Sequence, residues 1–325
     1  MVNIFSDETE FDIKQTRYPT AGWLSAKTAL LFSILFFTSI ASAHEFWIEP
    51  VTGSSPGSPV VTELRNGESF EGVAYPYNAD LFVRFDLLSA SSTLEISNST
   101  NALPAVNITP DTDGPHTLLY VSNRKYLEYE AFSDVREFAA EDGVTETLDA
   151  LVADGVATDN WTETYTRYTK SLLNVGGQLL KDKSHDLELE IILLQPLQAT
   201  DRTNPDELSP SNDREVLLRL DYLGKPLEGG MIGIFQRSRS MNLGTINVLD
   251  SNAAVHRNKA SFTSLTKVRT GSDGTFTLNL EPGHDYLLNS VYAKPAGDKL
   301  FTIPGLPDKR KVSWETIWSS LTFSY

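Results

Sequence analysis

Cysteine is absent from the 325 residues of this sequence. Its absence excludes disulfide scaffolds, thiolate metal sites and a cysteine-linked lipid anchor, so the folded parts must be held together by packing. The chain is long enough to bury sizeable cores without such links, and its length is typical of two domains.

Basic residues are also scarce. The 27 lysines and arginines face 43 aspartates and glutamates, which gives a formal net charge of −16. A surface of this charge repels nucleic acid and anionic lipid, so we expect no nucleic-acid partner. It is compatible with cation binding, although an acidic surface can also serve only to keep a protein in solution.

Catalytic motifs are missing as well. The five histidines form no H-x-H or H-E-x-x-H pattern, and the sequence has neither a nucleophile elbow nor a phosphate-binding glycine loop. We therefore expect a protein that is not an enzyme and that carries no organic cofactor.

One apolar run, TALLFSILFFTSI at 28–40, follows Lys27 and precedes the small residues Ala-Ser-Ala at 41–43. A basic flank, an apolar core and a small-residue cleavage site form the pattern of a signal peptide. The run is short for a membrane span, which is the alternative reading, and no later stretch is long and apolar enough to cross. We therefore predict that residues 1–43 are removed, that the mature protein begins at His44, and that it is periplasmic or otherwise secreted.

Beyond this segment, short apolar runs alternate with turn residues, which predicts a mostly β, α+β protein. A helical insertion is expected around 130–177, because Phe132, Val135 and Phe138 have helical spacing and the pattern continues through 161–173. The expected strands are 60–64, 81–87, 118–121, 185–194, 216–220, 231–235, 275–280 and 286–292.

A polar stretch at 195–214 contains three prolines and is typical of a linker. It divides the expected mature chain into an amino-terminal β domain with the helical insertion, 44–200, and a β-sandwich domain, 201–325. The turn segments GKPLEGG, SDGTF and PGHDY of the second part resemble those of transthyretin-like or carboxypeptidase-regulatory-like sandwiches. The Asp273-Gly274 pair is a tight hairpin signal.

Several segments together resemble one bacterial family across nearly the whole expected mature chain. They are HEFWIEP at 44–50, then 128–143, 167–173, 224–227 and 314–323. The family consists of exported proteins of unknown function called NikM-like, or the periplasmic component of a cobalt/nickel transport system. The resemblance implies an extracytoplasmic protein linked to divalent metals, with a metal transporter or an envelope protein as its partner. The family's pattern has a histidine near the position of 291–293, which is missing here.

His44 is the most distinctive candidate ligand. After cleavage it would carry a free α-amine and an imidazole, and these two nitrogens can chelate one metal ion. A second imidazole would complete a nitrogen site suited to Cu or Ni. Such a site weakens in acid, because its nitrogens must lose their protons. The alternative is that His44 simply begins the chain and that Phe46 and Trp47 start the first core strand.

His116 and His185 are the candidates for the further ligands, so the expected metal site consists of His44, His116 and His185 and binds Ni, Co or Cu. The alternative for His116 is an exposed turn histidine. His185 precedes a predicted strand in which Glu188 and Glu190 alternate with apolar residues, as on a solvent-facing side. The remaining histidines, His256 and His284, lie in a polar loop and a turn.

Two further groups of residues have alternative roles. Glu45 and Glu49 could supply oxygen ligands or merely solubilise the first strand. Trp47, Trp161, Trp314 and Trp318 could line a sugar-binding platform, but their spacing favours core packing. Three functions stay open: a non-enzymatic carrier of a divalent metal, a metal-free binding or scaffold module for an envelope protein or polysaccharide, and a copper-dependent oxidative enzyme.

Overall fold

The structure is a computed structural model, and it describes residues 45–51, 55–177, 179–198, 215–239 and 264–325. The predicted signal peptide, His44, His256 and most of the predicted linker lie outside the described residues. The described part is mostly β with two α-helices, which confirms the predicted fold class. Neither of these two helices is long and apolar enough to cross a membrane.

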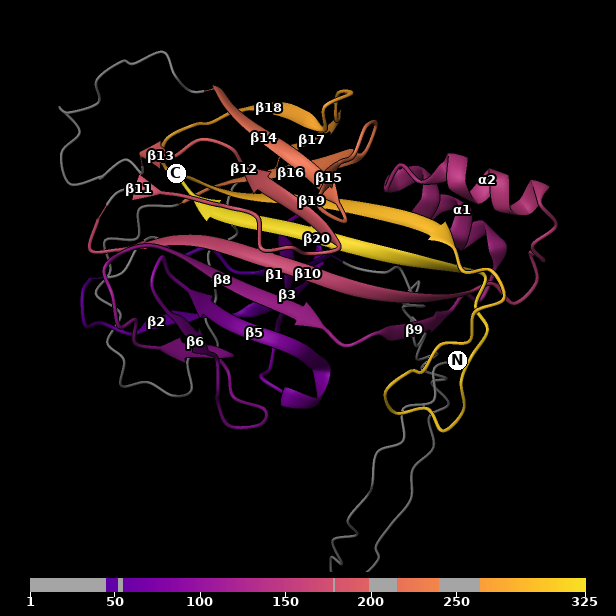
Figure 1. The fold of residues 1–325 in the computed structure, drawn as a ribbon, viewed down its shortest axis with the longest axis horizontal. Helices are drawn as coiled ribbons and strands as arrows, with labels where there is room; N and C mark the ends of the chain where they lie inside the picture. Colours follow the sequence, from indigo (N-terminus) through magenta and orange to yellow (C-terminus); the bar gives the residue numbers. More distant parts are fainter. Residues whose placement is uncertain (1–44, 52–54, 178, 199–214, 240–263) are drawn as a thin grey trace, which may run out of the picture. The chain divides into compact units, whose positions relative to one another are not determined.

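A nine-stranded sheet forms the middle of the fold (Figure 1). Its neighbours are antiparallel except β10 and β20, which run parallel from the Glu163–Trp314 pair to the Ser171–Thr322 pair. A further strand, β9 (Lys125–Glu128), pairs with the start of β10. The other strands, in spatial order, are β17 (Ser264–Arg269), β16 (Met231–Ser238), β19 (His284–Pro295), β20 (Trp314–Ser324), β10 (Thr162–Val175), β8 (Gly114–Ser122), β5 (Phe82–Leu88) and β6 (Thr93–Glu95).

Smaller sheets cover this large one. In Figure 1 the sheet of β12, β14 and β18 lies above the long strands β19 and β20, and β2 lies below them. The smaller sheets are β1 (Glu45–Ile48), β3 (Leu64–Glu68) and β4 (Glu71–Tyr75); β12 (Leu189–Leu193), β14 (Glu215–Tyr222), β15 (Lys225–Pro226) and β18 (Thr275–Asn279); β2 (Val60–Thr62) and β7 (Val106–Ile108); and β11 (Leu179–Leu180) and β13 (Leu197–Gln198).

Alternating apolar residues build two cores on the sheets. Leu218 and Leu220 of β14 point to the same side, since side chains two apart share a face of a strand. They pack with Ile191, Leu288 and Leu321 in one core, beneath β12 and β14. A second core contains Phe46, Ile48, Leu64, Phe85, Leu118 and Tyr120, from β1, β3, β5 and β8. Strands from both predicted domains, 44–200 and 201–325, share the nine-stranded sheet.

The two helices, α1 (Phe132–Glu141) and α2 (Thr145–Ala153), pack on a third, aromatic core. The ring of Phe138 stacks on Trp318 at a centroid distance of 5.6 Å, and Trp161 meets Trp314 edge-on at 5.5 Å. Trp47 is also buried. These four tryptophans therefore belong to cores, as their spacing predicts.

The expected helical stretch 161–173 is wrong, because residues 162–173 belong to β10. The segment reads TETYTRYTK, in which threonine and tyrosine are residues that favour strands. Its backbone bonds to β20 on one side and to β8 and β9 on the other. Pairing on both sides therefore outweighs the helical spacing of the apolar residues. The strand expected at 185–194 is also shorter, since β12 begins at Leu189.

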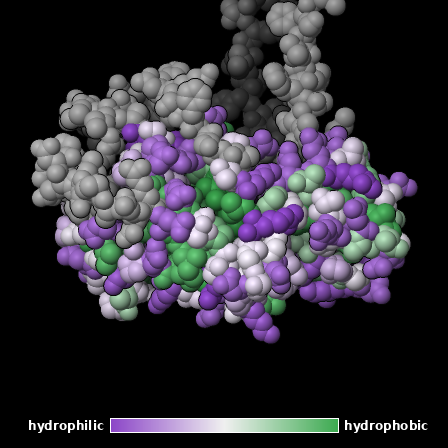
Figure 2. Space-filling model, turned by 90° about the horizontal axis from the view of Figure 1, so that it is seen from above, coloured by the Kyte–Doolittle hydropathy of each residue, from purple (hydrophilic) through white to green (hydrophobic). Residues whose placement is uncertain are grey.

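The outer surface mixes hydrophobic and hydrophilic side chains (Figure 2). Figure 2 shows the face seen from above Figure 1, where hydrophobic side chains gather near the middle and hydrophilic ones surround them. Several large apolar residues are exposed among the described ones; they are Val61, Val73, Val83, Leu103, Leu194, Leu217, Leu223 and Leu300.

Two leucine-to-alanine changes test the assignment of the first core. Leu288 of β19 is fully buried there, whereas Leu300 is 57% exposed. We expect Leu288→Ala to lower the free energy of unfolding by about 2–5 kcal/mol, because it leaves a cavity. Leu300→Ala should change it by less than about 0.5 kcal/mol. Urea denaturation monitored by circular dichroism measures both, and equal losses would contradict this core.

Candidate functional site

The first described strand, β1, is fixed on the large sheet by side-chain hydroxyl groups. The hydroxyls of Thr169 and Ser320 donate to the carbonyl oxygen of Phe46 at 3.3 and 2.9 Å, and Thr322 donates to that of Ile48 at 2.7 Å. The other edge of β1 pairs with β3, where Glu45 lies opposite Gly67. The position of Glu45 therefore follows from contacts of β1 with the interior of the fold.

Glu49 follows β1 and is a buried ion-pair partner. Its Oε1 accepts from Arg237, and its Oε2 accepts from the Trp47 indole at 3.1 Å and lies 3.5 Å from Arg65 Nε. Burial alone would raise the pKa of Glu49, but Arg237, with Trp47 and Arg65, holds it below its ordinary value. The expectation that Glu49 solubilises the strand is wrong, because only 7% of it is exposed.

Glu45 lines a small pocket that is rich in carboxylates. We call it the acidic pocket, and it has a volume of about 160 Å³. It lies where the start of β1 and the end of β3 meet the end of α1, β16 and β19. Its lining residues are Glu45, Glu68, Ser69, Glu141, Asp142, Met231, Gly233, Phe235, Lys267, Asn289 and Trp318.

Two of these carboxyl groups hold their protons unusually tightly. Burial, with the nearby charge of Asp142, raises the pKa of Glu45 to about 8 against the opposing backbone bonds from Ser69 and Phe70. Burial also raises the pKa of Asp142 to about 7, although Lys267 opposes it. The Oε2 atom of Glu45 is buried and has no hydrogen-bond partner among the described residues. The pocket therefore offers oxygen atoms that a proton or a bound cation would stabilise.

His44, the first predicted ligand, lies outside the described residues. In the sequence it directly precedes Glu45, which lines the acidic pocket.

His116, the second predicted ligand, is buried in β8 instead of exposed in a turn. One ring nitrogen, Nδ1, lies 2.9 Å from the carbonyl oxygen of Gly114, and Nε2 lies 3.2 Å from the Thr112 hydroxyl. Nδ1–H donates to the carbonyl, so Nε2 accepts from the hydroxyl. Both nitrogens thus have partners, one in the first residue of β8 and the other just before the strand.

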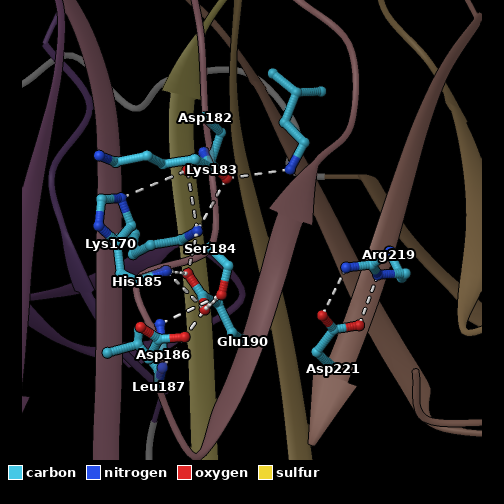
Figure 3. Close-up of polar contacts among 11 residues, drawn as sticks. Lys170, Asp182, Lys183, Ser184, His185, Asp186, Leu187, Glu190, Arg219 and Asp221 are labelled. Atoms are coloured by element: carbon cyan, nitrogen blue, oxygen red, sulfur yellow. Dashed lines mark hydrogen bonds and ion pairs between the residues drawn. The ribbon is translucent and has the colours of Figure 1, made fainter. Parts of the chain in front are cut away.

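His185, the third predicted ligand, lies beside three buried charged groups (Figure 3). Lys170 Nζ is 2.9 Å from both Asp182 Oδ2 and Glu190 Oε1, and His185 Nε2 is 3.9 Å from Asp182 Oδ1. Burial and the nearby charge of Lys170 lower the pKa of His185. Glu190 is 1% exposed, so the expectation that it lies on a solvent-facing side is wrong.

The described residues contain no ready-made metal centre. Within those ranges no three histidine, aspartate or glutamate side chains are grouped as metal ligands. His116 bonds to Thr112 and Gly114, whereas the backbone N–H of His185 donates to Glu190, so the two histidines have no hydrogen-bonding residue in common here. His284 is the first residue of β19, and its Nδ1 is 3.2 Å from the carbonyl oxygens of Glu281 and Pro282 in the preceding turn segment.

Sequence reasoning missed Asp142, Lys170 and Asp182. Asp142 follows α1 and is followed by Gly143, whose φ is +72°, a conformation that favours glycine. That signal marks the end of a helix, but it does not show that the helix ends beside β1. Lys170 follows a polar, threonine-rich stretch, and such a stretch predicts an exposed lysine side chain.

Comparison with known proteins gives a family but no function. A family model described as a domain of unknown function, DUF4198, matches residues 41–294. No curated protein matches the sequence.

Comparison with solved structures does not add a function. Trypsin-activated alpha-2-macroglobulin from Escherichia coli is 13% identical, with a TM-score of 0.20 over 88% of this chain and 16% of that one. A Salmonella alpha-2-macroglobulin mutant is 12% identical, with a TM-score of 0.19 over 87% and 15%. The chain therefore spans about a sixth of the length of these structures, and likeness at this level supports no statement about fold or function.

Replacing Glu45 with glutamine should stabilise the protein at alkaline pH. The folded protein binds this proton more tightly than the unfolded chain does, because the pKa rises from 4.5 to about 8. Stability contributed by Glu45 is therefore lost as the pH rises between these values. We expect Glu45→Gln to gain at least about 1 kcal/mol of unfolding free energy at pH 9 relative to its effect at pH 4.

Urea denaturation of both proteins at the two pH values measures this difference. Glu95→Gln, at an exposed glutamate of β6, is the matched control and should show no pH-dependent gain. Equal behaviour of the two variants would contradict the burial of the Glu45 carboxyl group.

Proposed function

This chain belongs to the DUF4198 family, and we propose that it is an exported protein that binds a divalent transition metal, Ni, Co or Cu, at its mature amino terminus and hands it to a partner. Within this proposal residues 1–43 are the signal peptide, and the protein acts in the periplasm or outside the cell. The resemblance to NikM-like proteins supports a metal transporter as that partner.

The observation that carries the proposal is the position of Glu45. The residue next to His44 places a buried carboxylate oxygen without a hydrogen-bond partner in a pocket that it shares with Glu68, Glu141 and Asp142. His44 would supply an amine and an imidazole nitrogen, and the pocket would supply carboxylate oxygens. Mixed nitrogen and oxygen donors of this kind suit Cu(II) and Ni(II).

The electrostatics of the pocket also support a cation. Burial, together with repulsion from neighbouring carboxylates, keeps Glu45 and Asp142 partly protonated near neutral pH. A metal ion would replace those protons with a larger positive charge, so its binding would release protons and would weaken in acid. Such a site suits reversible capture and release.

Anchoring of β1 supports the same site. The hydroxyls of Thr169, Ser320 and Thr322 fix β1 on the large sheet as far as Phe46, the residue after Glu45. Glu45 therefore needs no rearrangement to present its carboxylate. A preorganised ligand lowers the entropic cost of binding.

A second function is favoured by a different surface feature, namely a metal-free module that binds an envelope protein or a polysaccharide. An open hollow of about 620 Å³ is lined by Val83, Val121, Tyr168, Leu187 and Leu223 among others. Val83 is 69% and Leu223 is 63% exposed at this hollow. Exposed apolar side chains at a concave surface are typical of a binding site.

Calorimetric titration with Cu(II), Ni(II) and Co(II) tests the proposed metal site. We expect the mature protein that begins at His44 to bind at least one ion, with affinity at least tenfold lower after His44→Ala or after addition of one glycine before His44. Glu45→Gln should weaken binding severalfold, because it removes an oxygen donor.

The control is again Glu95→Gln, which keeps the formal charge equal to that of Glu45→Gln and should leave the affinity unchanged. Absence of binding by all three ions, or affinity that is unaffected by His44→Ala, would overturn the metal site and favour the metal-free module.

A further inference from the structure

Lys170 occupies a place that lysine rarely takes. It is only 1% exposed in the middle of β10, and its side chain ends among other buried groups. Lysine is almost never fully buried unless it is paired. Here the ammonium lies between Asp182, which precedes β12, and Glu190 within β12 (Figure 3).

The three groups are in contact and closed off from water. Lys170 Nζ lies 3.1 and 2.9 Å from the two carboxylate oxygens of Asp182 and 2.9 Å from Glu190 Oε1. The side chains of Asp182 and Glu190 are 0% and 1% exposed. The buried apolar residues within three positions of these groups along the chain include Leu172, Leu180, Leu187, Leu189 and Ile191.

The charges of this group do not balance. One ammonium faces two carboxylates, and removing each ion from water carries a large desolvation cost. Transfer of a proton from the Lys170 ammonium to a carboxylate would remove two charges at once. A neutral amine would then lie beside a neutral carboxylic acid, at a separation close to that of reacting atoms held for attack.

We propose that Lys170 and Asp182 become joined by an intramolecular isopeptide bond, with Glu190 as the group that carries the protons. The Lys170 Nζ lone pair attacks Cγ of protonated Asp182, and an N–C bond forms. Glu190 takes a proton from the nitrogen and returns it to the departing Asp182 oxygen, which leaves as water. The ammonium and the carboxylate are thus converted into one amide and one water, with no change in oxidation state.

Neighbouring groups are arranged to assist this step. The backbone N–H groups of Lys183 and Leu193 donate to the two Asp182 oxygens at 2.9 and 3.1 Å. Such donors stabilise the negative charge that develops on oxygen when the carbonyl carbon is attacked. Glu190 is itself fixed by the Ser184 hydroxyl and the backbone N–H of His185, each at 2.9 Å.

The bond would tie two parts of the fold together covalently. Lys170 belongs to the nine-stranded sheet, and Asp182 precedes the strand β12 of the sheet above it. In a chain without cysteine, an amide link of this kind would give the covalent support that disulfides give elsewhere.

Intact mass spectrometry of the denatured full chain tests the proposal. We expect a mass lower by one water, about 18 Da, than the sequence requires, and tryptic peptides in which Lys170 and Asp182 fragment as one cross-linked species. Lys170→Met and Glu190→Gln should both restore the full mass, because the first removes the nucleophile and the second removes the proton carrier.

The same peptide map contains an internal control. Lys311 and Asp298 form an ion pair at 2.7 Å, but their side chains are 62% and 98% exposed, so this pair should stay unlinked. A full-mass wild-type protein that trypsin cleaves after Lys170 would overturn the proposal. A loss of water with Lys170 still free would also overturn it, since that result indicates an aspartyl succinimide.

Discussion

The last strand, β20, is the element on which the rest of the structure depends. Every residue of Trp314–Ser324 is buried, and its backbone bonds to β19 on one side and to β10 on the other. Its side chains serve different neighbours. Trp314 and Trp318 join the aromatic core, Leu321 joins the core beneath β12 and β14, and Ser320 and Thr322 bond to β1. The start of the described chain is thereby fixed by its end.

This anchoring gives two glutamates of one short segment opposite properties. Glu49 lies against Arg237 and Arg65, so its charged form is favoured. Glu45 has burial and Asp142 instead, so its neutral form is favoured. The difference is the presence of an arginine beside one carboxylate and not the other. Four carboxyl groups line the acidic pocket, those of Glu45, Glu68, Glu141 and Asp142, against the single lysine Lys267. Lys267 only partly offsets the raised pKa of Asp142, which is why we propose that a bound metal supplies further positive charge.

The sequence supports the overall fold and the core tryptophans, because both follow from local patterns of apolar and turn residues. The sequence does not predict the strand at 162–173, because the apolar residues there also have helical spacing. Pairing with β8, β9 and β20 makes this segment a strand. The sequence also fails for Glu190 and Lys170, because a charged residue in a strand reads as exposed until its partner is known. The acidic pocket needs Glu45 and Asp142 together, and their proximity depends on how α1 packs against the sheet, which no local pattern encodes.

The central claim is that His44 and the acidic pocket form one metal site. Electron paramagnetic resonance of the mature protein loaded with one equivalent of Cu(II) tests it most directly. We expect nitrogen hyperfine couplings from both the α-amine and the imidazole of His44, which are lost when a glycine precedes that residue. A spectrum with oxygen ligands alone, or one that is identical with and without the added glycine, would contradict it.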